Sequence, residues 1–141
     1  MRKTIPPEVE KLARAIDLIA REGWRGLPAL TGAEPLQRDK IATLFEARGV
    51  DELTAGNVFE SWPHILEAVR TARADHANEW NIYAAFIFRK AIYIPHWGGR
   101  SVAAVIAEKF NSTEWAVRRT VRKMPVMIAQ YAGRLSTDAP A

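Results

Sequence analysis

The chain has 141 residues, of which 48% are hydrophobic, and a formal net charge of +4 at pH 7. This length and composition predict one soluble globular domain with its own core, and the absence of cysteine excludes disulfides, thiolate metal sites and thiol catalysis. No apolar run is long enough to cross a membrane, and the N-terminus lacks the apolar region of a signal peptide, so we expect a cytoplasmic protein.

The first predicted helix covers residues 7–21. Proline is tolerated in the first turn of a helix, so Pro6 and Pro7 mark its start, and Gly23 is a typical stop. Apolar residues at helical spacing form a stripe along it: Val9, Leu12, Ile16 and Ile19. A loop rich in Gly and Pro follows over residues 24–35, and we expect a hinge there.

Residues 36–62 predict two further helices with the outline of a helix-turn-helix. The first ends before Gly49, and Thr54 is the expected cap of the second. However, the connection over 48–53 is longer than a tight turn needs. The second helix also presents polar and acidic side chains rather than cations: Asn57, Glu60 and Ser61. We therefore interpret residues 1–75 as a helical half that supplies core and dimer contacts.

A helix from 77 to 92 is apolar almost all round, which is typical of a central helix or of a subunit interface. Before this helix, Pro63 either interrupts the helix predicted over 54–62 or begins the next one, which runs to about residue 74. Residues 84–94 are also rich in aromatic and β-branched side chains, so a strand is the alternative there. We favour the helix, followed by an extended segment and a loop that ends at Arg100.

Residues 101–124 predict a pair of short helices joined by a tight turn. Ser101 is placed to cap the first helix, and Asn111 tolerates the left-handed backbone that such a turn requires. Apolar residues occur at helical spacing on both sides of the turn: Ile106, Ala107 and Phe110, then Val117, Val121 and Met124. Pro125 is expected to end the second helix. A short further segment then stops at Gly133, and residues 136–141 form a tail.

This pair resembles the helix-turn-helix of bacterial and phage transcription regulators over residues 106–124. Ala107 is the small residue inside the first helix, and Val117 is the buried β-branched residue of the second. Asn111 stands where the family usually has Gly, which is a mild departure because Asn also adopts a left-handed backbone. Residues 92–95, Ile-Tyr-Ile-Pro, are similar to Mor-type phage activators, but those carry a further helix for which this chain lacks room.

The resemblance implies an all-α protein whose C-terminal half, residues 76–135, binds DNA and carries the helix-turn-helix at 101–124. Such a protein binds double-stranded DNA, regulates transcription and forms a homodimer on a two-fold site. The expected DNA contacts lie at the loop before the pair and along the second helix: Arg100, Ser112, Thr113, Glu114, Trp115, Arg118, Arg119, Arg122 and Lys123.

Each expected contact has a role that follows from its position. Arg118 and Arg119 suit guanine, Glu114 suits a cytosine amino group, and Trp115 suits a thymine methyl or a sugar. The residues at the two ends of the helix suit phosphates: Arg100, Ser112, Thr113, Arg122 and Lys123. The alternatives are helix caps at Ser112 and Thr113, a first-turn charge at Glu114, a core-edge aromatic at Trp115, and a solvated basic face for the cations.

The basic residues concentrate in the half that carries this pair. Residues 1–75 hold 11 Lys and Arg against 12 Asp and Glu, whereas residues 76–141 hold 9 against 4. A polyanion would be drawn to the second half, and its binding would depend on salt. A solvated basic surface is the alternative reading of the same charges.

Catalysis and cofactors have little support in the sequence. The histidines His64, His76 and His96 are scattered, and Gly98-Gly99 lacks the Lys-Ser/Thr partner of a phosphate loop. We therefore expect neither an enzyme nor a cofactor. Two other functions stay open: a DNA-docking subunit of a phage or plasmid packaging, replication or partition machine, and a protein-interaction module with a basic face.

Overall fold

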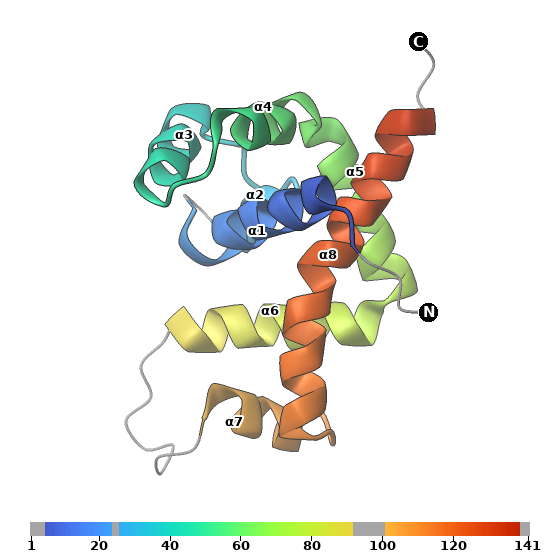
Figure 1. Ribbon diagram of the computed structural model, residues 1–141. Coiled ribbons are helices and arrows are strands. Elements are labelled where there is room, and N and C mark those ends of the chain that lie inside the picture. Colours follow the sequence, from blue (N-terminus) through green and yellow to red (C-terminus); the bar gives the residue numbers. More distant parts are fainter. Residues whose placement is uncertain (1–4, 24–25, 92–100, 139–141) are drawn as a thin grey trace.

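The computed structural model describes residues 5–23, 26–91 and 101–138, and these consist of eight helices and no strand (Figure 1). The helices are α1 (Pro7–Glu22), α2 (Leu27–Leu30), α3 (Arg38–Ala47), α4 (Glu52–Glu60), α5 (Trp62–Asp75), α6 (Ala77–Ala91), α7 (Val102–Lys109) and α8 (Glu114–Asp138). The predicted all-α class is confirmed. The alternative of a strand over 84–94 is wrong for residues 84–91, which belong to α6; the rest lies outside the described residues.

The longest helix, α8, is the element on which most of the others pack. It runs through the length of the molecule, with α1 and α5 against its C-terminal half, α6 crossing it, and α7 beside its start (Figure 1). Its buried side chains recur at helical spacing along one face: Val117, Val121, Met124, Ile128 and Ala132. Burial of this continuous stripe is the main reason that these residues form one helix.

The predicted end of this helix at Pro125 is wrong, and so is the predicted stop at Gly133. Both residues lie inside α8, which continues to Asp138. Proline in a helix interior removes one backbone hydrogen bond and costs about 3 kcal/mol. The buried stripe keeps its spacing on both sides of Pro125, so packing against α1 and α5 offsets this cost. Residues 136–138 of the predicted tail are helical, and residues 139–141 lie outside the described part.

A polar contact in the core ties α1 to α6. The side chain of Tyr83 is fully buried, and its hydroxyl donates to Asp17 Oδ1 at 2.8 Å. The other carboxylate oxygen lies 2.8 Å from Arg21 Nε, and the Arg21 guanidinium lies 5.5 Å from the centre of the Phe86 ring. Burial, and then the neighbouring Asp17 charge, raise the pKa of Tyr83 well above its ordinary value. Tyr83 is therefore a neutral phenol, and it shares the half-buried carboxylate of Asp17 with Arg21.

The α3–α4 pair covers the side of α1 away from α8, and its cap differs from the prediction. Asp51, not Thr54, caps α4: Asp51 Oδ1 accepts from the Thr54 backbone N–H at 2.7 Å. The Thr54 hydroxyl donates to the other oxygen of the same carboxylate at 3.0 Å. Because α4 begins at Glu52, the turn has only the four residues 48–51, so the predicted longer connection is also wrong.

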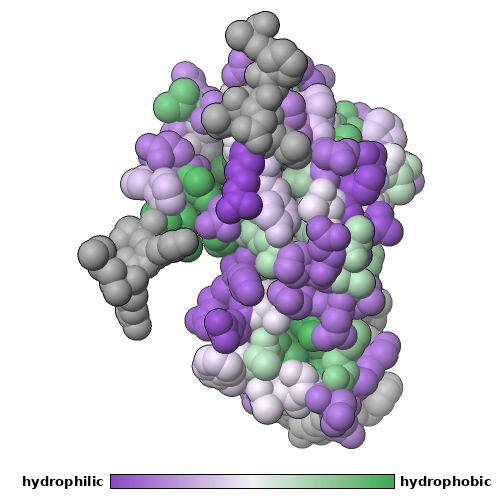
Figure 2. Space-filling model, turned by 90° about the vertical axis from the view of Figure 1, so that its right-hand side faces the viewer, coloured by the Kyte–Doolittle hydropathy of each residue, from purple (hydrophilic) through white to green (hydrophobic). Residues whose placement is uncertain are grey.

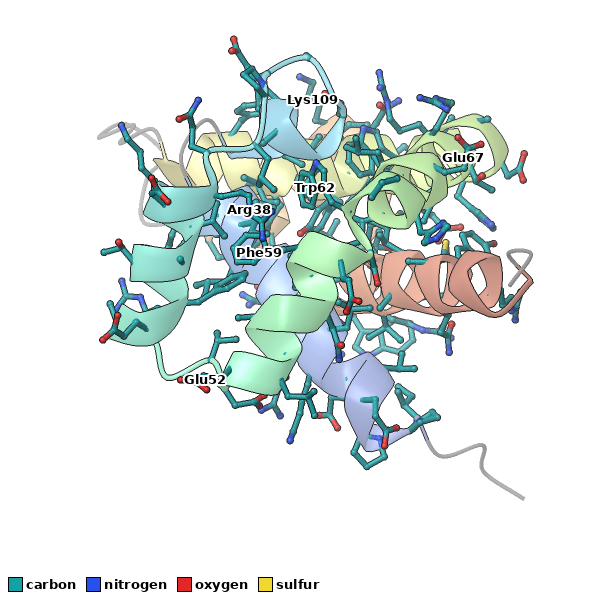
Figure 3. All side chains as sticks on the ribbon, turned by 90° about the horizontal axis from the view of Figure 1, so that it is seen from above. Arg38, Glu52, Phe59, Trp62, Glu67 and Lys109 are labelled. Carbon is teal, nitrogen blue, oxygen red and sulfur yellow. The ribbon has the colours of Figure 1, made fainter. Side chains whose placement is uncertain are left out.

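Aromatic and cationic side chains close the interface between α3 and α4. The guanidinium of Arg38 lies 4.8 Å from the centre of the Phe59 ring, and Figure 3 shows the two side chains meeting between the helices. In the same view Glu52 lies at the outer end of α4, away from Trp62. Pro63 occupies the first turn of α5 and therefore begins that helix rather than interrupting α4. The segment predicted as a loop over 24–35 contains α2, whose Leu27 and Leu30 are buried.

Candidate nucleic-acid interface

In the turn between α7 and α8, one residue with a left-handed backbone ends the first helix, and the second helix begins three residues later. Asn111 has a φ of 52°, and the Ser112 backbone N–H donates to the Ala107 carbonyl at 2.8 Å. Thr113 then caps α8, because its Oγ1 accepts from the Ala116 backbone N–H at 3.1 Å. The expected turn geometry at Asn111 is confirmed, and the cap interpretation of Thr113 agrees with this contact.

The turn between α3 and α4 has the same construction. Gly49 has a φ of 73°, and the Val50 backbone N–H donates to the Phe45 carbonyl at 2.9 Å. Asp51 then caps the next helix as Thr113 caps α8. The sequence predicted the outline of this second pair but not the equal length of its turn, because the two turns share no residue. The shared signal is a residue that tolerates positive φ followed two positions later by a capping side chain.

The start of α8 turns its cations away from the core. Val117 is fully buried and Val121 is 6% exposed, so this side of the helix packs inward. The opposite side is exposed and carries six of the predicted contact residues: Glu114, Trp115, Arg118, Arg119, Arg122 and Lys123. Ser112 and Thr113 are also exposed, whereas Arg100 lies outside the described residues. We call these exposed residues, from Ser112 to Lys123, the α8 face.

Trp115 is the large apolar side chain of the α8 face. It is 66% exposed, and the guanidinium of Arg119 lies 5.4 Å from the centre of its ring. A cation over the face of an aromatic ring gains a modest electrostatic attraction, which favours this position of the Arg119 charge above the ring. The structure therefore places Trp115 in solvent beside a cation and not at the edge of the core.

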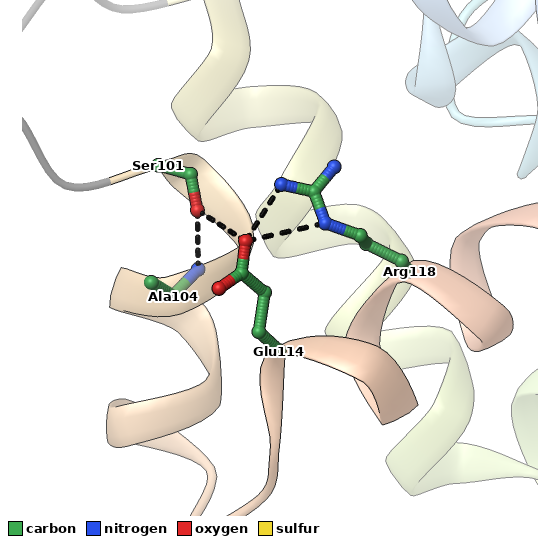
Figure 4. A network of polar contacts seen from close by, with 4 residues as sticks. All are labelled: Ser101, Ala104, Glu114 and Arg118. Atoms are coloured by element: carbon green, nitrogen blue, oxygen red, sulfur yellow. Dashed lines mark hydrogen bonds and ion pairs between the residues drawn. The ribbon is translucent and has the colours of Figure 1, made fainter.

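Glu114 is the centre of a small polar network (Figure 4). Its Oε1 accepts from the Nε and one terminal nitrogen of Arg118, at 3.3 and 2.7 Å, and from the Ser101 hydroxyl at 2.9 Å. Ser101 Oγ also accepts from the Ala104 backbone N–H at 3.1 Å, so it caps α7 as predicted. The Arg118 hydrogen bond, and then that from Ser101, hold the pKa of Glu114 below its ordinary value.

The far end of the α8 face borders an open hollow of about 350 Å³ between α1 and α8. Arg122 lines it from α8, and two acidic and two basic residues line it from α1: Glu10, Arg14, Asp17 and Arg21. Figure 2 shows a side of the molecule that is mainly hydrophilic, with a hydrophobic patch near the end where α7 and the start of α8 lie. The carboxylates of α1 beside Arg122 are thus each paired with an arginine of their own helix.

The exposed side of α4 is the counterpart of the α8 face, but its charge is opposite. The positions that follow the Asp51 cap at the same spacing are all exposed: Glu52, Leu53, Gly56, Asn57 and Glu60. They correspond in order to Glu114, Trp115, Arg118, Arg119 and Arg122. Leu53, like Trp115, is a strongly exposed apolar residue, at 77%. The α3–α4 pair therefore repeats the turn, the cap and the exposed positions of the α7–α8 pair, without cations at those positions.

Other kinds of functional site have little support among the described residues. They contain no group of three or more side chains that could hold a metal ion. Of the three histidines, His76 lies 3.2 Å from the Tyr131 hydroxyl through Nε2 and 3.6 Å from a Glu79 oxygen through Nδ1, and His96 lies outside the described residues. No helix in the described part of the chain has the length and apolar character that a membrane span requires.

The α8 face therefore combines exposed cations, one exposed aromatic side chain, two hydroxyls at a helix start and one carboxylate. Such a face can contact an anionic, grooved partner through charge and through bidentate hydrogen bonds. Comparison of the chain with known protein families, curated proteins and solved structures found no match.

Proposed function

We propose that the protein binds double-stranded DNA by placing the start of α8 in the major groove, and that it regulates transcription as a homodimer. The observation that carries the proposal is the arrangement of Arg118, Arg119, Arg122 and Lys123 on the exposed side of a helix start whose other side is anchored by Val117 and Val121. Arginine is the side chain that most often reads guanine in this groove.

The shape of the molecule supports this mode of docking. Together with α6 and α7, the start of α8 forms one end of the molecule, opposite the α3–α4 pair (Figure 1). Residues 114–123 span roughly 15 Å at the rise of an α-helix, and the major groove is about 12 Å wide. The C-terminal half of α8 is covered by α1 and α5, so contact with bases is limited to the first turns. Recognition helices in helix-turn-helix proteins also contact bases mainly through their N-terminal residues.

The contacts divide by their position along α8. Arg118 and Arg119 lie on the second turn, where base edges come within reach. Ser112 and Thr113 at the helix start, and Arg122 and Lys123 further along, lie where the helix meets the two phosphate backbones. One helix start reads few base pairs, so a second copy on a two-fold site would supply the remaining contacts.

Salt-dependent binding to random duplex DNA, measured by fluorescence anisotropy, tests the proposal. Arg122→Ala combined with Lys123→Ala should lower the affinity and reduce the slope of log K against log salt by up to about two, because both residues are placed at phosphates and each phosphate contact contributes about 0.9. Arg48→Ala combined with Arg70→Ala is the matched control. Both of its arginines are exposed and paired with glutamates elsewhere on the surface, and it changes the charge equally.

An equal loss in both double variants would contradict the proposal, because it would show attraction by net charge alone. A chain that shows no salt-dependent retention on DNA would favour the protein-interaction module. If DNA binding is found, footprinting on the DNA that flanks the protein's own gene separates a regulator from a docking subunit of a larger machine.

A further inference from the structure

The contact between Glu114 and Arg118 uses only one edge of the guanidinium. Glu114 Oε1 accepts from Arg118 Nε and from one of its terminal nitrogens. Figure 4 shows the second terminal nitrogen of Arg118 pointing away from Glu114. A guanidinium has five N–H donors in a planar fork, so the edge between its two terminal nitrogens keeps its donors. Arg118 can therefore hold Glu114 and a second bidentate acceptor at the same time.

Guanine is the base whose major-groove edge fits such a free edge. Its O6 and N7 are two adjacent acceptors, and two parallel donors from an arginine match them. An unsupported arginine must lose its side-chain freedom when it binds, and this loss reduces affinity. The ion pair with Glu114, an i,i+4 contact on the first turns of α8, restricts Arg118 before DNA arrives.

Ser101 connects this pair to the neighbouring helix. Its hydroxyl donates to Glu114 Oε1 at 2.9 Å, and its oxygen accepts from the backbone N–H of Ala104 in the first turn of α7. The carboxylate is therefore held from both helices of the pair. Its charge also opposes DNA phosphates wherever Arg118 does not find a guanine, which weakens binding to other sequences.

We propose that Glu114 is a positioning residue that holds Arg118 to read one G·C base pair, and that Ser101 holds Glu114 in place. The inference rests on the proposed binding of DNA and adds the base pair that is read and the residues that make the reading selective. Glu114 itself contacts no base in this arrangement, so its role differs from that of a cytosine acceptor.

The test begins with selection of a preferred site from random duplex DNA by the full chain. Anisotropy then measures affinity for that site and for every single-base-pair change in it. At one G·C position, Arg118→Ala should remove the preference for that base pair, which is a loss of at least about fivefold in discrimination. Glu114→Gln should reduce the preference at that same position and leave the other positions unchanged, with affinity for non-specific DNA equal or higher. Ser101→Ala should reduce the preference at the same position by a smaller amount. Ser101→Thr keeps a hydroxyl and should therefore retain the wild-type preference.

Glu108→Gln is the matched control, because it removes the same charge from the exposed side of α7. It should leave the preference at every position unchanged. Circular dichroism and thermal unfolding verify that each variant is folded. A combined Glu114→Gln and Arg118→Ala variant should match Arg118→Ala alone at the G·C position.

Three results would overturn the inference. Loss of preference at a different position in Glu114→Gln would make Glu114 a direct reader of its own base. A uniform change at all positions, or no change, would show a structural or purely electrostatic role. In each of these cases the wild-type chain still binds DNA with dependence on salt, so the proposed function survives. Absence of that binding would overturn the function and the inference together.

Discussion

Asn111 and Gly49 occupy equivalent positions in two turns of the same construction, with φ values of 52° and 73°. A left-handed backbone costs a residue with a Cβ roughly 1–2 kcal/mol, and Asn tolerates it better than most. A Cβ at Gly49 would have no atom within 4 Å, so Gly49→Ala tests the backbone cost without a clash. We expect Gly49→Ala and Asn111→Ala to lower the free energy of unfolding by about 1 kcal/mol each, and Asn111→Gly to maintain or raise it. Urea unfolding followed by circular dichroism measures these changes. A larger loss for Asn111→Gly than for Asn111→Ala would contradict the backbone explanation.

The buried phenol of Tyr83 should make the protein less stable in alkali. Its pKa is raised above the ordinary value of 10.0 in the folded state, so the folded protein holds the proton more tightly than the unfolded chain does. This contribution is fully present below pH 10.0 and is lost as the pH rises through the higher folded value. Tyr83→Phe should remove that dependence and cost about 1–3 kcal/mol at neutral pH through the lost hydrogen bond to Asp17. Unfolding free energies on both sides of pH 10.0 measure the effect. Equal alkaline dependence in wild type and Tyr83→Phe would contradict it.

The Asp51 cap should make the stability of the protein depend on pH in acid rather than in alkali. The hydrogen bond from the Thr54 backbone N–H, followed by that from its hydroxyl, lowers the pKa of Asp51 below 3.8. A lowered folded pKa gives stability that is present above the unfolded value and is lost as the pH falls through the folded value. Asp51→Ala should therefore destabilise the protein at neutral pH and reduce the loss of stability in acid. Asp51→Asn keeps an acceptor for the cap and should recover most of the stability at neutral pH. No difference between Ala and Asn would show that the cap contributes nothing measurable.

Trp115 should matter to binding and not to folding. With 66% of its surface exposed, Trp115→Ala should change the free energy of unfolding by less than about 0.5 kcal/mol. The same variant should weaken DNA binding, because the aromatic contact and the placement of Arg119 over the ring are both lost. Leu53→Ala, at the equivalent exposed position of α4, is the control and should leave DNA affinity unchanged. Thermal unfolding and anisotropy together separate the two effects.

Local residue chemistry predicted several features of the fold. Pro7 and Gly23 bound the first helix, Ser101 caps α7, and Asn111 makes the turn before α8, because each of these depends on neighbours in sequence. The exposure of the cations on the α8 face also followed from helical spacing alone.

The features that the sequence did not predict depend on contacts between distant segments or on a choice between competing local signals. Pro125 is a strong stop in isolation, and only burial against α1 and α5 explains why α8 continues through it. Asp51 and Thr54 are both good capping residues, and the choice between them depends on where the turn closes. Likewise, the contact of Ser101 with Glu114 requires α7 to return beside the start of α8, which spacing along either helix does not reveal.

The uninterrupted course of α8 has a mechanical consequence. The same 25-residue helix carries the exposed cations at its start and contacts α1 and α5 over its later turns, so no loop separates the two ends. A partner that grips the first turns would orient the entire molecule, including the acidic α3–α4 end, at a set angle. Little rotational freedom inside the chain would then be lost on docking, and the far end would always point away from the partner.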